Sequence, residues 1–188
     1  MSTHPHFPSL VFLGRSGPSG IYLLRLHVTQ PLLLALGALH GGRPIGFPPG
    51  PYLYVGSALA QRGATSLPRR LLRHATRCAG APHPLRRPLQ LAFPVTSPPA
   101  RKRLHWHVDY LLEAPAVSLS HALLVYTSRP LERAFAAWVQ RRPNITAPVP
   151  GAGASDAPGQ THLFAVAPYP GWWADLGSAA ARRFAQEL

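Results

Sequence analysis

The sequence contains little cysteine, little acid and almost no lysine. Cys78 is its single cysteine, which excludes an internal disulfide framework and a zinc cluster built from cysteines. No segment approaches the roughly 20 consecutive apolar residues that cross a bilayer, and the start of the chain lacks a basic leader followed by a long apolar run. We therefore expect a soluble cytoplasmic protein that neither spans a membrane nor forms a disulfide with a partner.

Acidic residues are so few that the chain is strongly basic. Lys and Arg number 19 against 6 Asp and Glu, and the formal net charge at pH 7 is +13. Because Lys102 is the single lysine, nearly all of these cations are guanidinium groups, which bind phosphate oxygens in pairs. Nucleic acid is therefore the first partner to expect, with an anionic membrane surface behind it. An arginine-rich composition of this kind also arises from the base composition of a genome.

The 188 residues suffice for one ordinary domain with a core. Residues 1–17 predict a loose N-terminal leader that can dock a strand, residues 18–168 the main domain, and residues 169–188 a C-terminal extension. Residues 79–100 carry many prolines and no sustained period. We expect them to form an inserted, mobile loop with a short extended piece at "LQLAF".

Strand-forming segments are separated by turns rich in Gly and Pro. The first three are "GIYLLRLHV" (20–28), "LLLALGAL" (32–39) and "YLYVG" (52–56), whose closeness along the chain predicts an antiparallel meander. Two later strands are expected at "VSLSHALLVYTS" (117–128) and "THLFAVAP" (161–168).

One helix is expected over residues 66–78, "SLPRRLLRHATRC", with Ser66 as N-cap and Pro68 in the first turn. At 100° per residue, one sector holds the apolar side chains, Leu67, Leu71, Leu72, Ala75 and Cys78. The opposite, outward sector holds the basic ones, Arg69, Arg70, Arg73, His74 and Arg77. Like charges at this spacing repel unless an anion lies against them. The pattern predicts nucleic-acid binding by Arg69, Arg73 and Arg77, with a simply solvated face as the alternative.

Further helices are expected at "RKRLHWHVDYLLE" (101–113) and "PLERAFAAWVQRR" (130–142), and a short helix or tail at "SAAARRFAQEL" (178–188). The neighbouring Trp172 and Trp173 suit either packing on the sheet or stacking on bases, and packing is the favoured interpretation.

Five segments in chain order resemble the GIY-YIG nuclease superfamily. Its two named motifs stand as Gly20-Ile21-Tyr22 and Tyr54-Val55-Gly56. The stretches "PYLYVGSALA", "RRLLRH", "RLHWHVDYLLE", "PVPGAGASD" and "THLF" are similar to the small stand-alone Uri-type branch over about residues 20–168. The resemblance implies an α/β fold class, as an α+β sandwich with helices flanking a small antiparallel or mixed sheet. It also implies an endonuclease that hydrolyses DNA with one Mg²⁺ or Mn²⁺ ion.

The resemblance assigns catalysis to five residues, Tyr22, Tyr54, Arg70, His74 and Glu132. Glu132 would bind the metal ion, although a first-turn glutamate also stabilises its own helix. A free tyrosine, with a pKa of about 10, is a poor base, so a nearby guanidinium is expected to favour its phenolate. Gly20 and Gly56 are expected at turns, Gly56 beside the substrate. The chain departs from the branch at Ala157, where a cysteine often follows the Ser155-Asp156 pair.

The segment "HWHVD" supports a rival centre. On a strand, His105, His107 and Asp109 share one face and can bind a metal ion. On a helix only His105 and Asp109 are neighbours, and these residues then orient the active site or a nearby loop. The continuing "DYLLE" favours the helix. Three hypotheses follow, namely the endonuclease, a nucleic-acid-binding module that lacks turnover, and a metal hydrolase centred on these three residues.

Overall fold

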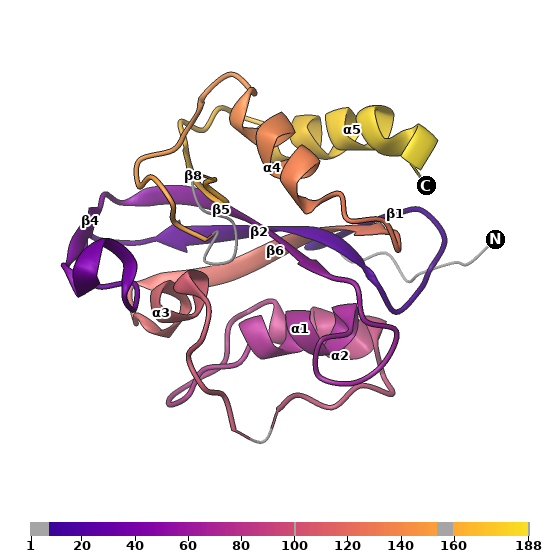
Figure 1. Ribbon diagram of the computed structural model, residues 1–188, viewed down its shortest axis with the longest axis horizontal. Coiled ribbons are helices and arrows are strands. Elements are labelled where there is room, and N and C mark those ends of the chain that lie inside the picture. The colour runs from indigo at the N-terminus through magenta and orange to yellow at the C-terminus, as the bar shows by residue number, and fades with distance from the viewer. Residues whose placement is uncertain (1–7, 100, 154–159, 188) are drawn as a thin grey trace.

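The computed structural model describes residues 8–99, 101–153 and 160–187, and it confirms the expected α+β sandwich. A six-stranded mixed sheet has the strand order β1-β6-β2-β5-β8-β7. Its strands are β1 (Leu10–Leu13), β2 (Gly20–Val28), β5 (Gly50–Ala58), β6 (Val117–Tyr126), β7 (Ile145–Thr146) and β8 (Leu163–Val166). Figure 1 shows helices above and below this sheet.

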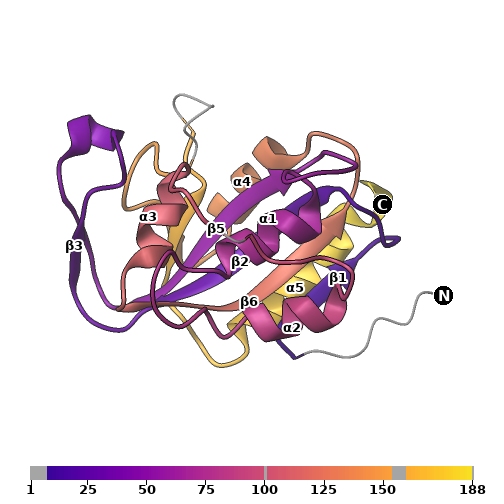
Figure 2. The same cartoon turned by 90° about the horizontal axis from the view of Figure 1, so that it is seen from below.

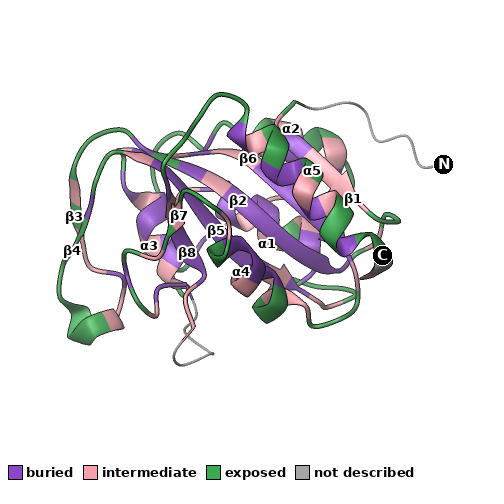
Figure 3. Cartoon of the chain, turned by 90° about the horizontal axis from the view of Figure 1, so that it is seen from above, coloured by how far each residue is buried: buried purple, intermediate pink, exposed green. Residues whose placement is uncertain are grey.

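The central strand β2 is buried on both faces because helices cover both. Successive side chains point to opposite faces of a strand. Ile21 and Leu23 accordingly join the core beneath α4 (Glu132–Gln140) and α5 (Trp172–Phe184). Tyr22 and Leu24 join the core beneath α1 (Leu67–His74), α2 (Arg86–Ala92) and α3 (His107–Glu113). Figure 3 shows the resulting band of buried strands between exposed helix faces.

The expected meander is wrong in its middle strand. Strands β2 and β5 pair directly and antiparallel to each other. The segment between them leaves the main sheet, because only Leu32–Leu34 is extended (β3) and it pairs with β4 (Ile45–Phe47) as a separate hairpin. Gly37, with φ of 62°, turns the chain before the short helix η1 (Leu39–Gly42). The hairpin forms an arm at one end of the molecule (Figure 2).

Helix α1 is shorter than its apolar period suggested. It ends at His74, four residues before Cys78, so Cys78 lies outside the helix and is exposed rather than packed in the core. His74 was expected on the outward, basic face but is fully buried. At 100° per residue His74 lies about 20° from Leu67, beside the apolar sector, and its ring faces Tyr22 and Tyr54 on the sheet, so the expected outward direction is wrong.

Three other expected boundaries change in the structure. The insert 79–100 contains helix α2 where an extended piece was expected, and buried Leu89 anchors that helix to the core. Helix α3 begins at His107 rather than at residue 101, and α5 begins at Trp172 rather than at residue 178, followed by η2 (Ala185–Glu187). Trp172 is buried in the core under α5, which confirms packing for this side chain.

The N-terminal segment 1–17 is not loose throughout, because β1 pairs in parallel with β6 inside the main sheet. The expected strands 117–128 and 161–168 and the helix 130–142 are confirmed as β6, β8 and α4 with shorter bounds. Among the described residues, no helix has both the length and the apolar character needed to cross a membrane. The loop pair Ser155-Asp156 and the departure at Ala157 lie outside the described residues.

Candidate functional site

A pocket of about 240 Å³ lies where β5 ends, at the meeting of both helical layers. Helix α1 reaches it from one face of the sheet and the first residue of α4 from the other. Its polar lining comprises Tyr22, Tyr54, Ser57, Thr65, Arg70 and Glu132. The structure thus brings together four of the five residues predicted for catalysis, and the fifth, His74, lies behind Tyr22.

Gly56 and Gly20 create space rather than turns, which corrects the expectation for both. Gly56 lies inside β5, directly opposite Tyr22 on β2. A Cβ atom on Gly56 would lie 2.5 Å from the Tyr22 hydroxyl, so only glycine leaves room for that ring. A Cβ atom on Gly20 would lie 2.4 Å from the carbonyl oxygen of Val125 on β6. Both glycines therefore permit close strand pairing beside the site.

Tyr22, His74 and Asp109 form a chain of polar contacts leading from the pocket into the core. The Tyr22 hydroxyl lies 2.9 Å from His74 Nε2, and His74 Nδ1 lies 3.5 Å from Asp109 Oδ1. The ring of Tyr54 lies 5.9 Å from that of His74 and 6.3 Å from that of Tyr22. With the carboxylate facing Nδ1, the imidazole proton belongs on Nδ1, which leaves Nε2 to accept from Tyr22.

Asp109 is ionised and held from several sides. Arg73 donates to both of its oxygens at 2.9 and 2.6 Å, and the backbone N–H groups of His105 and Trp106 donate to Oδ2 at 3.0 and 2.9 Å. Burial alone would raise the pKa of Asp109, but contacts with His74 and Arg73 outweigh it and hold that pKa far below its usual range. The carboxylate therefore orients His74 and also caps the start of α3.

The basic row on α1 is not the open phosphate-binding face that was expected. Arg73 uses its guanidinium on Asp109 and on the carbonyl oxygen of Arg103. Arg77 donates to the carbonyl oxygens of Glu113, Ala114 and Val117. Arg73 thus joins α1 to the start of α3, and Arg77, just after α1, joins the chain to the end of α3 and the start of β6, because a carboxylate and carbonyls at those ends need donors. Their expected availability to a phosphate backbone is therefore wrong.

Arg69 and Arg70 differ from those two arginines. Arg69 is exposed, and no hydrogen bond or ion pair joins either guanidinium to another described residue. Arg70 lies over the indole of Trp106, 4.9 Å from its centroid, and lines the pocket. The N–H groups of a guanidinium point outward in its own plane, so stacking on an indole leaves them free. Arg70 can therefore bind an anion that enters the pocket.

The tyrosines are protonated at neutral pH, contrary to the expected effect of a nearby guanidinium. Burial raises the pKa of Tyr22, and the opposing charge of Arg70 offsets only part of that increase. Burial likewise raises the pKa of Tyr54 well above its ordinary value. Burial also lowers the pKa of His74 to about 4, against the pull of Asp109, so the imidazole is neutral at pH 7.

Glu132 is positioned by two residues that the sequence patterns did not reveal. Ser57 Oγ donates to Glu132 Oε2, and His162 Nδ1 lies 3.0 Å from Glu132 Oε1. Burial would raise the pKa of Glu132, but the contacts with His162 and Ser57 lower it overall, which favours the carboxylate. Ser57 directly follows the Tyr-Val-Gly tripeptide and His162 precedes β8, yet neither position shows a period or spacing that indicates a role.

The alternative metal centre at "HWHVD" does not assemble in this fold. Its residues span the start of α3, where His105 is exposed and precedes the helix. His107 Nδ1 accepts from the backbone N–H of Gly153 at 3.2 Å, while Asp109 is occupied by Arg73. In the described part of the chain, no three His, Cys, Asp or Glu side chains form a group that could hold a metal ion. Asp109 instead orients His74, as the helical interpretation expected.

Comparison with protein families places this chain in one of them. The family model described as Domain of unknown function DUF123 matches residues 21–170. The chain belongs to that family. No curated protein matches this DUF123 chain, and no solved structure matches it. The match contains every pocket residue named above and ends just before α5.

The oxygen donors of this DUF123 site suit a hard divalent cation. A carboxylate offers about four lone-pair positions, so the contacts from Ser57 and His162 leave Glu132 able to bind an ion. The Glu132 side chain is 26% exposed and faces the pocket. One carboxylate is enough for Mg²⁺, which usually keeps several of its waters. Glu132, with the Ser57 hydroxyl beside it, would hold such an ion.

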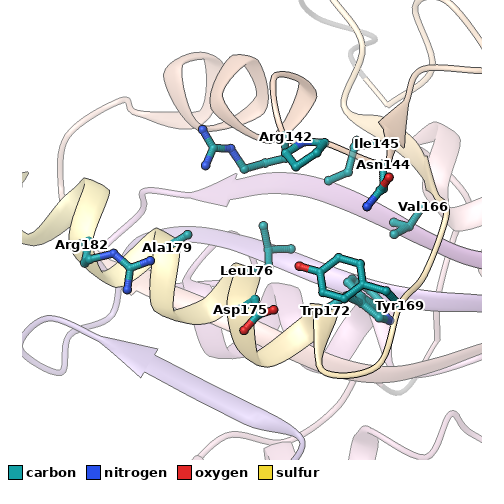
Figure 4. A pocket seen from close by; sticks show the side chains of 11 residues that line it. Arg142, Asn144, Ile145, Val166, Tyr169, Trp172, Asp175, Leu176, Ala179 and Arg182 are labelled. Atoms are coloured by element: carbon teal, nitrogen blue, oxygen red, sulfur yellow. The ribbon is translucent and has the colours of Figure 1, made fainter.

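A second pocket, of about 220 Å³, lies between α5 and the end of α4 (Figure 4). Its floor is apolar, with Val166, Trp172 and Leu176, and its single carboxylate is Asp175. Arg142 at its rim already lies over the ring of Trp138, 5.0 Å from the centroid. Tyr169 and Arg182 also line this pocket, but none of the five residues predicted for catalysis does, so it is not the candidate site.

Proposed function

We propose that this protein is a metal-dependent endonuclease of the GIY-YIG type that hydrolyses phosphodiester bonds in DNA. The carrying observation is one pocket in which Tyr22, Tyr54, Arg70 and Glu132 meet from four separate elements. Its polar groups suit the hydrolysis of a phosphodiester. That reaction needs a cation to stabilise the negative charge on the phosphate and a proton acceptor for the attacking water. The net charge of +13 favours a polyanionic substrate.

Arg70 is the group that grips the substrate. Its guanidinium has no hydrogen-bonding partner among the described residues and is held by stacking on Trp106. It can therefore donate to a nonbridging oxygen and stabilise the negative charge that grows in the transition state. Tyr54, which lines the same pocket, donates a further hydrogen bond to the phosphate. A divalent cation on Glu132 would neutralise charge at the leaving oxygen.

Tyr22 acts as a proton relay rather than as a free phenolate. As the water oxygen bonds to phosphorus, a water O–H bond breaks and its proton passes to Tyr22 Oη. The Tyr22 proton passes at the same time to His74 Nε2, 2.9 Å away. The bond from phosphorus to the leaving oxygen breaks, and that oxygen takes a proton from solvent. The new imidazolium faces the Asp109 carboxylate, which stabilises it.

Nicking of supercoiled plasmid in Mg²⁺ or Mn²⁺ tests this function. Wild type should nick the plasmid, and Glu132→Gln and Arg70→Gln should each lose about 100-fold or more in rate. Arg141→Gln removes an exposed charge from the far end of the same helix, α4, and serves as the matched control. Equal cleavage by Glu132→Gln and wild type would refute the assignment.

Two further outcomes separate the alternatives. Salt-dependent binding of duplex, single-stranded and branched DNA and of RNA, with no cleavage of any of them, would indicate a binding module that lacks turnover. Cleavage of RNA alone would retain the site chemistry and change the substrate. The proposal also includes a cytoplasmic location, which suits the lone Cys78 and which cell fractionation can test.

A further inference from the structure

A second depression adjoins the candidate site on the other side of Glu132. It has a volume of about 300 Å³ and is lined in part by Pro130, Arg133, Gln160 and His162. Three residues line both depressions, namely Ser57, Leu59 and Glu132. The side chains of Ser57 and Glu132 are joined by a hydrogen bond and form the wall between the two spaces. The two depressions therefore share one edge, and a long ligand can occupy both by crossing that edge.

The second depression contains one unengaged cation. Arg133 is exposed, and no hydrogen bond or ion pair joins it to another described residue. Glu132 is the one acidic residue in the described lining, and Ser57 and His162 already contact its two oxygens. Arg70 lines the first depression, Arg133 lines the second, and Glu132 lines both.

We propose that Arg133 and the depression beside it form a subsite for the backbone phosphate next to the one held by Arg70. This inference rests on the proposed function, because it takes a nucleic-acid strand to be the substrate. The strand crosses Glu132 with one phosphate at Arg70 and its neighbour at Arg133. One guanidinium on the reacting phosphate and a second on its neighbour fix the position of the reacting bond, as phosphate contacts position a protein on nucleic acid.

The subsite has a consequence for the substrate. A ligand that fills both places must carry a second phosphodiester beside the one that is cleaved, so the arrangement favours a strand of three or more nucleotides over a dinucleotide. Arg133 would also supply a phosphate contact near the site that Arg73 and Arg77 were expected to supply, because the donors of those two arginines are used within the fold.

Binding without added metal, in a buffer that contains EDTA, measures the subsite independently of cleavage. Fluorescence anisotropy with a labelled DNA oligonucleotide should show affinity falling about tenfold in Arg133→Ala at 0.1 M salt. The slope of log K against log salt should decrease by about one. Arg141→Ala, an equal charge change at the other end of α4, should leave the slope near that of wild type.

A thermodynamic cycle locates the phosphate. A series of oligonucleotides carries one neutral methylphosphonate at each successive position. At one position wild type should lose about tenfold in affinity while Arg133→Ala loses nothing further, since both changes remove the same contact. The inference is overturned if no position shows this coupling, or if Arg133→Ala and Arg141→Ala weaken binding equally. Failure of wild type to cleave would instead reject the proposed function, while the coupling would still report the binding subsite.

Discussion

Tyr22 and Gly56 stand directly opposite each other on β2 and β5, and a Cβ atom at position 56 would lie 2.5 Å from the tyrosine hydroxyl. The missing side chain of Gly56 therefore makes the space in which the Tyr22 phenol reaches His74. A steric relationship between two adjacent strands thus controls whether the polar chain from the pocket to Asp109 can form.

Replacement of this glycine should reveal the steric relationship in the free energy of unfolding. Gly56→Ala should destabilise the fold by roughly 1–3 kcal/mol, because the added methyl group overlaps a fully buried ring. Urea denaturation of the variant measures this loss. Gly46→Ala on β4 is the control, since a Cβ atom there meets nothing within 4 Å. An equal, small effect of both changes would contradict the close approach to Tyr22.

The proton position on His74 is predicted to differ from that on another buried histidine. In His74 the proton lies on Nδ1, which faces Asp109, and Nε2 accepts from Tyr22. In His83 the proton lies on Nε2, which donates to the Leu112 carbonyl oxygen, because Nδ1 accepts from the Leu119 N–H. Nitrogen-15 NMR of the imidazoles should show these opposite tautomers, with His83 as an internal reference.

Tyr22→Phe tests the proposed proton relay from Tyr22 to His74. The variant should keep the fold to within about 1.5 kcal/mol, the value of one hydrogen bond, and lose cleavage by about 100-fold or more. Its His74 should keep the proton on Nδ1, since Asp109 is unchanged. A proton found on Nε2 of His74 in the wild type would reverse the direction of the hydrogen bond and eliminate the relay.

The two buried neutral histidines should make the fold sensitive to acid. Burial lowers the pKa of both His74 and His83 to about 4, below the value of about 6.5 in an unfolded chain. Below pH 6.5 the unfolded state therefore binds more protons, and stability falls as the pH decreases toward 4. Each histidine contributes at most roughly 3 kcal/mol to this loss.

His83→Gln isolates one of these contributions, because an amide can replace both hydrogen bonds but does not titrate. Its unfolding free energy, measured by urea denaturation, should change less between pH 6.5 and pH 4 than that of wild type. His27→Gln changes an exposed histidine and should keep the wild-type pH dependence. A His83→Gln profile parallel to wild type would mean that His83 does not resist protonation in the fold.

The arginines of α1 should separate into two groups on substitution. Arg73→Gln should cost about 3–5 kcal/mol of stability, because it removes the guanidinium that donates to both oxygens of the buried Asp109 carboxylate and leaves Lys102, 4.0 Å away, as its cation. Arg69→Gln should change stability by less than about 0.5 kcal/mol and should decrease the salt slope of DNA binding by about one. Thermal unfolding and anisotropy measure the two effects. Equal stabilities of the two variants would contradict the structural role of Arg73.

Much of the fold and the order of the site residues could be predicted from the sequence. Local periodicity was sufficient for β2, β6 and α4, where apolar side chains repeat at the spacing of one element type. The prediction for residues 32–39 was wrong because an apolar pattern does not show which sheet a strand joins. In the structure Leu32–Leu34 belongs to a separate hairpin.

For the candidate site too, the sequence determined one part and the tertiary structure decided the rest. By itself the sequence determined the strong positive charge, the lack of an internal disulfide and the chain order of Tyr22, Tyr54, Arg70 and Glu132. Tertiary structure decided which groups are free to act. Arg73 meets Asp109 from 36 residues away, and Glu132 meets Ser57 from 75 residues away. Helical phase shows the direction of a side chain, but only the packing of distant segments determines whether solvent, a carboxylate or a substrate lies in that direction.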